Sequence, residues 1–123
     1  MADSPLSQRL EEIRRRFASK LDPKFEETDA SLPLLTGEGA SVIEAVSATY
    51  RRFHEICGTG RTLGFSHLGA AAGVAETILL EPFRAGRGLT DREVLMLKQA
   101  LEALRSAARI ELKEINTDRE YKS

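Results

Sequence analysis

The chain has 123 residues, of which 41% are hydrophobic and 30% are charged, and its formal net charge is -1. This composition is that of a globular domain, it argues against a surface devoted to nucleic acid, and no apolar run approaches the roughly 20 residues that cross a membrane. A single cysteine excludes an intrachain disulfide, and the N-terminal residues lack the apolar core of a signal peptide, so we expect a cytoplasmic protein.

The first elements follow helix signals near the N-terminus. Ser4-Pro5 places a capping residue before a proline at the first helical position, and Asp22-Pro23 repeats the arrangement for a second segment. Pro33 should kink or end that segment, and Gly37 and Gly39 should break the chain. The first helix is predicted from apolar residues that recur at helical intervals: Leu6, Leu10, Ile13, Phe17 and Leu21.

Two capping boxes and a serine mark the later helices. Ser41 with Glu44 predicts the start of a third helix that runs to about residue 63, and Ser66 can cap the fourth. Thr90 with Glu93 predicts the start of the last helix. That helix carries a long apolar stripe: Val94, Leu97, Leu101, Leu104, Ala108 and Ile115.

The fourth helix should end at Pro82 and Gly86-Arg87-Gly88, and the polar tail at 117–123 should fray. Strand signals are nearly absent. Long amphipathic helices with short connections predict an all-α fold, an up-down antiparallel four-helix bundle with a short additional N-terminal helical segment. We expect residues 1–123 to form one domain with its bundle core at about 6–115.

The third helix carries a histidine beside glycines. At about 100° per residue, His54 lies a quarter-turn from the core-facing side and shares its own face with Arg51, Gly58 and Arg61. Each glycine inside a helix costs ~0.8–1 kcal/mol relative to alanine. Gly58 therefore needs a reason, and a bare patch one turn from His54 would let a bulky group reach the ring. The core-facing residues of this helix are Val42, Val46, Thr49, Phe53 and Gly60.

Several chemistries compete for this stretch. A phosphate-binding glycine loop needs a preceding strand and the GxGxxG spacing, and a zinc helix of the HExxH type needs a second histidine where Gly58 stands. A nucleophilic pair of Cys57 with His54 lacks an evident orienting acid. The remaining alternative is a boundary histidine with incidental glycines.

The residues around His54 resemble the signature of histidine phosphotransfer (Hpt) domains, and the continuation GFSHL resembles the phosphotransfer domain of chemotaxis histidine kinases. The resemblance implies a four-helix bundle, a phosphoryl group carried on His54, and room for it left by Gly58. Its implied partners are a response-regulator receiver domain and a sensor histidine kinase, with no nucleic acid and no membrane. No cofactor is implied for this chain, since the Mg²⁺ belongs to the partner receiver. The matching positions are His54, Ile56, Gly58, Leu63 and Gly64.

One position departs from the family pattern and another matches it. The family usually has lysine three residues after the histidine, where this chain has Cys57, and Arg61 or Arg51 could supply the missing charge. Some members carry a carboxylate or amide twenty-two residues after the histidine, and this position is Glu76. A carboxylate that accepts the Nδ1 proton would leave Nε2 as the nucleophile.

Two other functions remain open. One is a degenerate phosphotransfer fold that binds receiver or kinase domains without being phosphorylated, and the replacement of lysine by Cys57 favours it. The other is a helical bundle with an unrelated role. For a phosphocarrier, the docking surface should surround His54 and include Tyr50 and apolar residues of the first helix, with the Arg14-Arg15-Arg16 run adding positive charge.

Overall fold

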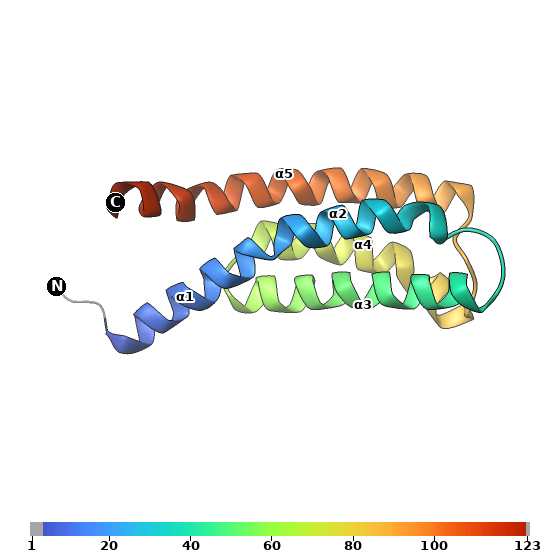
Figure 1. Ribbon diagram of the computed structural model, residues 1–123, viewed down its shortest axis with the longest axis horizontal. Coiled ribbons are helices and arrows are strands. Elements are labelled where there is room, and N and C mark those ends of the chain that lie inside the picture. Colours follow the sequence, from blue (N-terminus) through green and yellow to red (C-terminus); the bar gives the residue numbers. More distant parts are fainter. Residues whose placement is uncertain (1–3, 123) are drawn as a thin grey trace.

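The computed structural model describes the backbone of residues 4–122 and the side chains of residues 4–113. The regular structure in this part of the chain is all helical, and it contains no strand (Figure 1). The elements are α1 (Pro5–Ser19), α2 (Leu21–Ser31), a 3₁₀ turn η1 (Leu32–Leu34), α3 (Ala40–Thr62), α4 (Ser66–Ala85) and α5 (Asp91–Lys122).

The helices form an elongated bundle. Helices α2, α3, α4 and α5 lie along the long axis of the molecule, whereas α1 continues from α2 and slants away at one end (Figure 1). The most extensive contact joins α3 to α4. None of the described helices is both long enough and apolar enough to cross a membrane.

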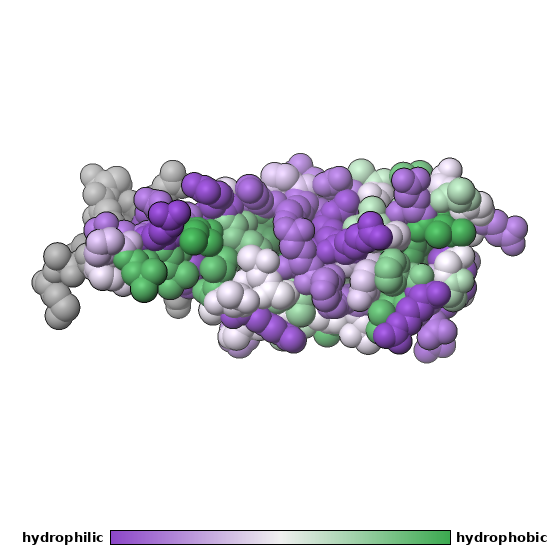
Figure 2. Space-filling view, turned by 90° about the horizontal axis from the view of Figure 1, so that it is seen from below, coloured by the Kyte–Doolittle hydropathy of each residue, from purple (hydrophilic) through white to green (hydrophobic). Residues whose placement is uncertain are grey.

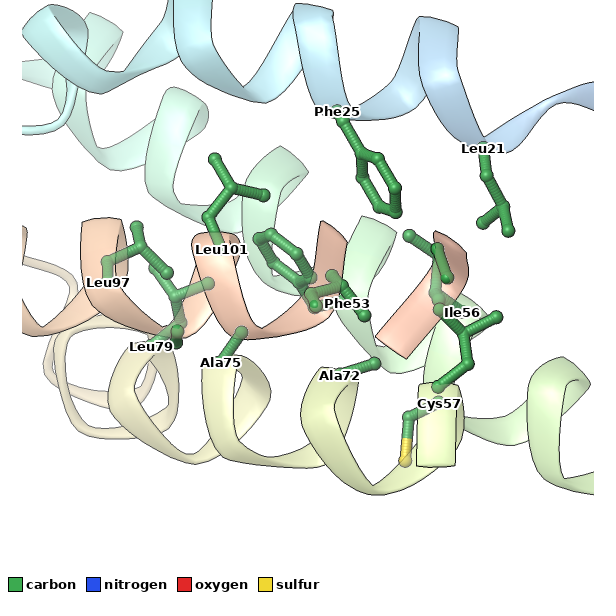
Figure 3. Packing of buried hydrophobic residues seen from close by; sticks show 14 of the residues in the cluster. Leu21, Phe25, Phe53, Ile56, Cys57, Ala72, Ala75, Leu79, Leu97 and Leu101 are labelled. Carbon is green, nitrogen blue, oxygen red and sulfur yellow. The ribbon is translucent and has the colours of Figure 1, made fainter. Parts of the chain in front are cut away.

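The core is built from apolar side chains that converge from all five α-helices. Figure 3 shows Phe53 and Ile56 of α3 packed between the side chains of α2, α4 and α5. Fully burying one such side chain stabilises the fold by about 1.5–3 kcal/mol. The core-facing side predicted for α3 is confirmed at Val46, Thr49, Phe53 and Gly60, all buried, while Val42 is half-buried. The core residues labelled in the figure from the other helices are Leu21, Phe25, Ala72, Ala75, Leu79, Leu97 and Leu101.

Two predicted helix starts are confirmed. The Ser4 hydroxyl accepts a hydrogen bond of 3.1 Å from the Ser7 N–H, and Pro5 is the first residue of α1. At α5, the Glu93 N–H donates to Thr90 Oγ1 at 3.1 Å and the Thr90 N–H donates to Glu93 Oε1 at 2.8 Å. This reciprocal pair satisfies two backbone donors that the helix itself leaves free.

The other predicted starts are wrong. Helix α3 begins at Ala40, so Ser41 is already helical, and Gly39 takes the cap position with φ 109° and no side-chain hydrogen bond. Helix α2 begins at Leu21, so Asp22 is already helical. Lys20 takes the cap position with a near-helical backbone and makes no side-chain cap hydrogen bond. Ser66 is likewise the first residue of α4 and does not cap it.

A carboxylate from another helix replaces the expected serine cap of α4. Glu111 of α5 accepts hydrogen bonds from the His67 N–H at 3.2 Å and the Leu68 N–H at 2.6 Å. A negative charge at a helix N-terminus is also favoured by the helix dipole. Glu111 therefore ties the start of α4 to the later part of α5.

Pro82 does not end α4. The helix continues through it to Ala85 and ends at Gly86, which has φ 64° and ψ 46°. Proline removes one backbone donor, but the residues after it keep the helical path, and the left-handed conformation that stops the helix falls on glycine. Pro33, by contrast, lies in η1 beyond the end of α2, as expected.

The apolar residues that predict the first helix divide between the core and the surface. Phe17 and Leu21 are buried, but Leu6, Leu10 and Ile13 are exposed, from 44% at Ile13 to 78% at Leu6. They lie on the part of α1 that slants away from the other helices (Figure 1). Figure 2 shows a hydrophobic area toward the N-terminal end of the molecule.

The last helix runs to Lys122, past position 117 where the predicted fraying begins. The side chains of the predicted tail, and that of Ile115 on the predicted stripe, lie outside the described residues. Of the described stripe residues, Leu97, Leu101, Leu104 and Ala108 are buried, and Val94 is half-buried.

Candidate functional site

His54 lies near the middle of α3 with its side chain on the surface. The side chain is 69% exposed, so the imidazole is open to a partner molecule. Its ring stacks on Tyr50, one turn earlier, with centroids 5.9 Å apart, and Tyr50 stacks on Phe83 of α4 at 4.3 Å. These stacked rings support one side of the histidine and leave the rest accessible.

Glu76 of α4 holds one nitrogen of this imidazole. His54 Nδ1 is 2.9 Å from Glu76 Oε2, and the glutamate side chain is only 20% exposed. Because an ionised carboxylate only accepts hydrogen bonds, the Nδ1–H donates, and in the neutral imidazole the other nitrogen, Nε2, then keeps its lone pair. The structure thus brings together two residues that lie twenty-two positions apart in the sequence.

Gly58 lies one turn after His54 and faces open space. A Cβ atom built at Gly58 meets no atom within 4 Å, so packing does not require glycine there. The helical penalty of ~0.8–1 kcal/mol is therefore not offset by a close contact. The approach to His54 from this side is unobstructed.

The other helical glycines of this region serve the contact between α3 and α4. A Cβ at Gly60 would lie 3.6 Å from the Gly69 nitrogen, so α4 approaches α3 closely at this core-facing glycine. Gly64 has φ 88° and follows the end of α3, where a left-handed backbone favours glycine. Sequence reasoning did not single out Gly69 or Gly73, the glycines of α4 that face α3.

Arg61 lies against these α4 glycines. A Cβ at Gly69 would stand 2.5 Å from Arg61 Cγ, and a Cβ at Gly73 would stand 3.4 Å from Arg61 Nη2. The arginine side chain therefore occupies space that only glycine leaves free. Arg51, on the same face of α3, is exposed and takes part in none of the described ion pairs.

Cys57 is buried and does not belong to the open face. It is 7% exposed, and its sulfur lies 3.6 Å from the Cβ position at Gly73. Figure 3 shows it among the core residues Ile56 and Ala72. The position where the resemblance to phosphotransfer domains expects lysine thus points into the contact between α3 and α4.

A hollow of about 640 Å³ opens over α4 beside Arg61 and Glu76. It is lined by Cys57 and Arg61 from α3, by Gly73, Glu76 and Thr77 from α4, and by Met96 from α5, among others. Glu76 and Arg61 therefore face the same space, one acidic and one basic.

The competing chemistries find no support in the described residues. The stretch from His54 is helical to Thr62 and is not a loop that follows a strand. No group of three metal-ligating side chains occurs among the residues described. The described hydrogen bonds include none between Cys57 and His54, and His67 is an exposed residue in the first turn of α4.

Comparison with known proteins gives no relative: no family model, no curated protein and no solved structure matches this chain.

Proposed function

We propose that the protein is a phosphocarrier of a two-component phosphorelay, which carries a phosphoryl group on His54 to or from an aspartate of a response-regulator receiver domain. The observation that carries this proposal is an exposed imidazole whose Nδ1 lies 2.9 Å from a partly buried carboxylate, beside a glycine with open space above it. The proposal includes the up-down antiparallel four-helix topology, a cytoplasmic location and a sensor histidine kinase as second partner.

The transfer chemistry needs little from this chain. The lone pair of His54 Nε2 attacks the phosphorus of an aspartyl phosphate, the bond from phosphorus to the aspartyl oxygen breaks, and its electrons return to the aspartate. The Nδ1 proton stays on the ring, where the Glu76 carboxylate offsets the positive charge that develops. The receiver domain supplies Mg²⁺ and its acidic pocket, so the contribution of this chain is positioning and electrostatic stabilisation.

A transfer assay tests the proposal. The protein is mixed with a panel of receiver domains phosphorylated on aspartate, and an acid-labile, base-stable label is followed on the wild type, His54→Gln and Glu76→Ala. We expect label on the wild type, none on His54→Gln, and uptake on Glu76→Ala slower by about tenfold, the worth of one hydrogen bond to a charged group.

The other outcomes assign the alternatives. Binding of a receiver without label would favour the degenerate binding module. Neither binding nor label across the panel would leave a helical bundle with an unrelated role. Equal labelling of the wild type and His54→Gln would contradict the assignment of the phosphoryl group to His54.

A further inference from the structure

The Arg61 side chain is seated in a groove on α4. Gly69 and Gly73 lie one turn apart on the same face of that helix, and Arg61 Cγ and Nη2 lie 2.5 Å and 3.4 Å from the Cβ positions that the two glycines leave empty. A residue with a side chain at Gly69 would collide with the arginine stem. The groove therefore guides the stem of the Arg61 side chain, although the residue as a whole is exposed to solvent.

That direction leads toward the histidine. Side chains on a helix lean toward its N-terminus, so the Arg61 guanidinium lies over the turn that contains Cys57, between its own backbone and the turn of His54. On α4, Gly73 precedes Glu76 by three residues, and Arg61 and Glu76 line the same hollow. The guanidinium therefore lies beside Gly73 and faces the hollow that Glu76 also lines.

This guanidinium is also available for a ligand. None of the ion pairs of the described residues involves Arg61, although Glu76 shares its hollow. The carboxylate is instead bound to His54 Nδ1. An arginine that is fixed by packing but unpaired can offer its planar set of donors to a new group of oxygens.

A phosphoryl group on His54 creates the need for such a cation. The group brings close to two negative charges, and the Glu76 carboxylate already lies at the same ring. The negative charges of the phosphoryl group and of the Glu76 carboxylate would therefore repel each other. Cys57, at the position where the resemblance expects a lysine, is buried and carries no charge to balance them.

From these contacts we infer that Arg61, held in the Gly69–Gly73 groove, binds the oxygens of the phosphoryl group on His54 and replaces the family lysine from one turn further along α3. This inference rests on the proposed function and adds to it the residue that stabilises the phosphorylated form. Arg51 is the rival cation, but no groove or ion pair among the described residues fixes it.

The test uses potassium phosphoramidate, a small donor that needs no partner protein. Its P–N bond breaks and ammonia leaves as the Nε2–P bond forms. Phosphohistidine formation and its later hydrolysis are followed by ³¹P NMR on the wild type, Arg61→Gln, Arg61→Lys, Arg51→Gln and, as a matched control, Arg84→Gln. Arg84 is an exposed arginine in the last turn of α4, two turns beyond Glu76.

We expect Arg61→Gln to lower the rate of formation by about tenfold and to shorten the lifetime of the phosphohistidine, because one charge-assisted contact is lost. Arg61→Lys should restore part of both, and Arg84→Gln should match the wild type. Glutamine keeps part of the stem that fills the groove, and circular dichroism checks that each variant is folded.

The outcomes separate the two proposals. Label on the wild type with an unchanged rate and lifetime in Arg61→Gln would overturn the role of Arg61 and leave the phosphocarrier standing. The same would follow if Arg51→Gln alone caused the loss. Absence of Nε2-phosphohistidine in the wild type would overturn both.

Discussion

At the residue scale, Gly58 lowers the stability of α3 but keeps the approach to His54 open. A Cβ there meets no atom within 4 Å, and the residue is helical with an ordinary backbone. A glycine that is neither strained nor crowded lowers the stability of the helix, and no contact within the molecule requires it. Its benefit must then lie in what approaches from outside.

We therefore predict that Gly58→Ala raises the free energy of unfolding by ~0.8–1 kcal/mol, measured by urea denaturation. Gly58→Phe should slow transfer from a receiver domain more than it slows labelling by the small donor phosphoramidate, since a clash of about 1–3 kcal/mol with the partner protein corresponds to roughly 5- to 150-fold. Transfer to Gly58→Phe at the wild-type rate would show that no partner passes over this position.

Gly64→Ala is the matched control for the stability measurement. Its Cβ also meets no atom within 4 Å, but its φ of 88° favours glycine. Alanine there should destabilise the protein by about 1–2 kcal/mol. A gain of stability in both variants would mean that backbone conformation does not decide the effect.

Residue identity alone could predict part of this site. The helical wheel places His54 at an edge and Gly58 beside it, because periodicity along one helix depends only on local sequence. The position of the Arg61 side chain depends on which glycines of α4 face it. The burial of Cys57 depends on the same contact between α3 and α4. Neither follows from spacing within α3.

At the element scale, the helix starts divide by the distance of their capping partners. Ser4 and the pair of Thr90 with Glu93 reach donors only three residues away, and both could be predicted from the sequence. The cap of α4 comes from Glu111, which is 43 residues from Leu68. Ser41 failed as a cap because Gly39, with its positive φ, begins the helix earlier.

The Glu111 cap gives a prediction for α4. Glu111→Ala leaves two N–H groups at the helix start without their acceptor, so we expect a loss of about 0.5–2 kcal/mol in the free energy of unfolding. Glu102→Ala, at an exposed position of the same helix, should change it by less than about 0.5 kcal/mol. Equal losses by urea denaturation would contradict the capping role.

At the scale of the whole molecule, the helical class and the buried faces of α3 and α5 could be predicted, whereas the course of α1 could not. The spacing of Leu6, Leu10 and Ile13 indicates that one face of α1 is apolar, but it does not indicate whether another helix covers that face. Here the rest of the bundle leaves that face exposed. Its exposure is compatible with the prediction that apolar residues of the first helix take part in docking by the proposed phosphocarrier.

Global stability should fall in acid through one ion pair. Arg87, after α4, contacts Glu93 of α5 at 2.8 Å, and this hydrogen bond lowers the pKa of Glu93 from the usual 4.5 to about 2. A lowered pKa in the folded state means that the stabilisation is complete above 4.5 and is lost as the pH falls toward 2.

The measurement compares thermal unfolding of the wild type and Glu93→Gln from neutral pH into this acidic range. We expect the wild type to be more stable near neutral pH and the difference to shrink below pH 4.5. A difference that stays constant across this range would show that the charge of Glu93 does not contribute.

The tie between Glu111 and the start of α4 also sets how short a working fragment can be made. A fragment that ends within the polar tail keeps both carboxylate bonds to α4, whereas one that ends before Glu111 loses them. Helix α4 carries Glu76, which binds the imidazole of His54. Deletions from the carboxyl end that stop short of Glu111 should therefore be tolerated. Deletions that remove Glu111 should weaken the hydrogen bond between Glu76 and the imidazole.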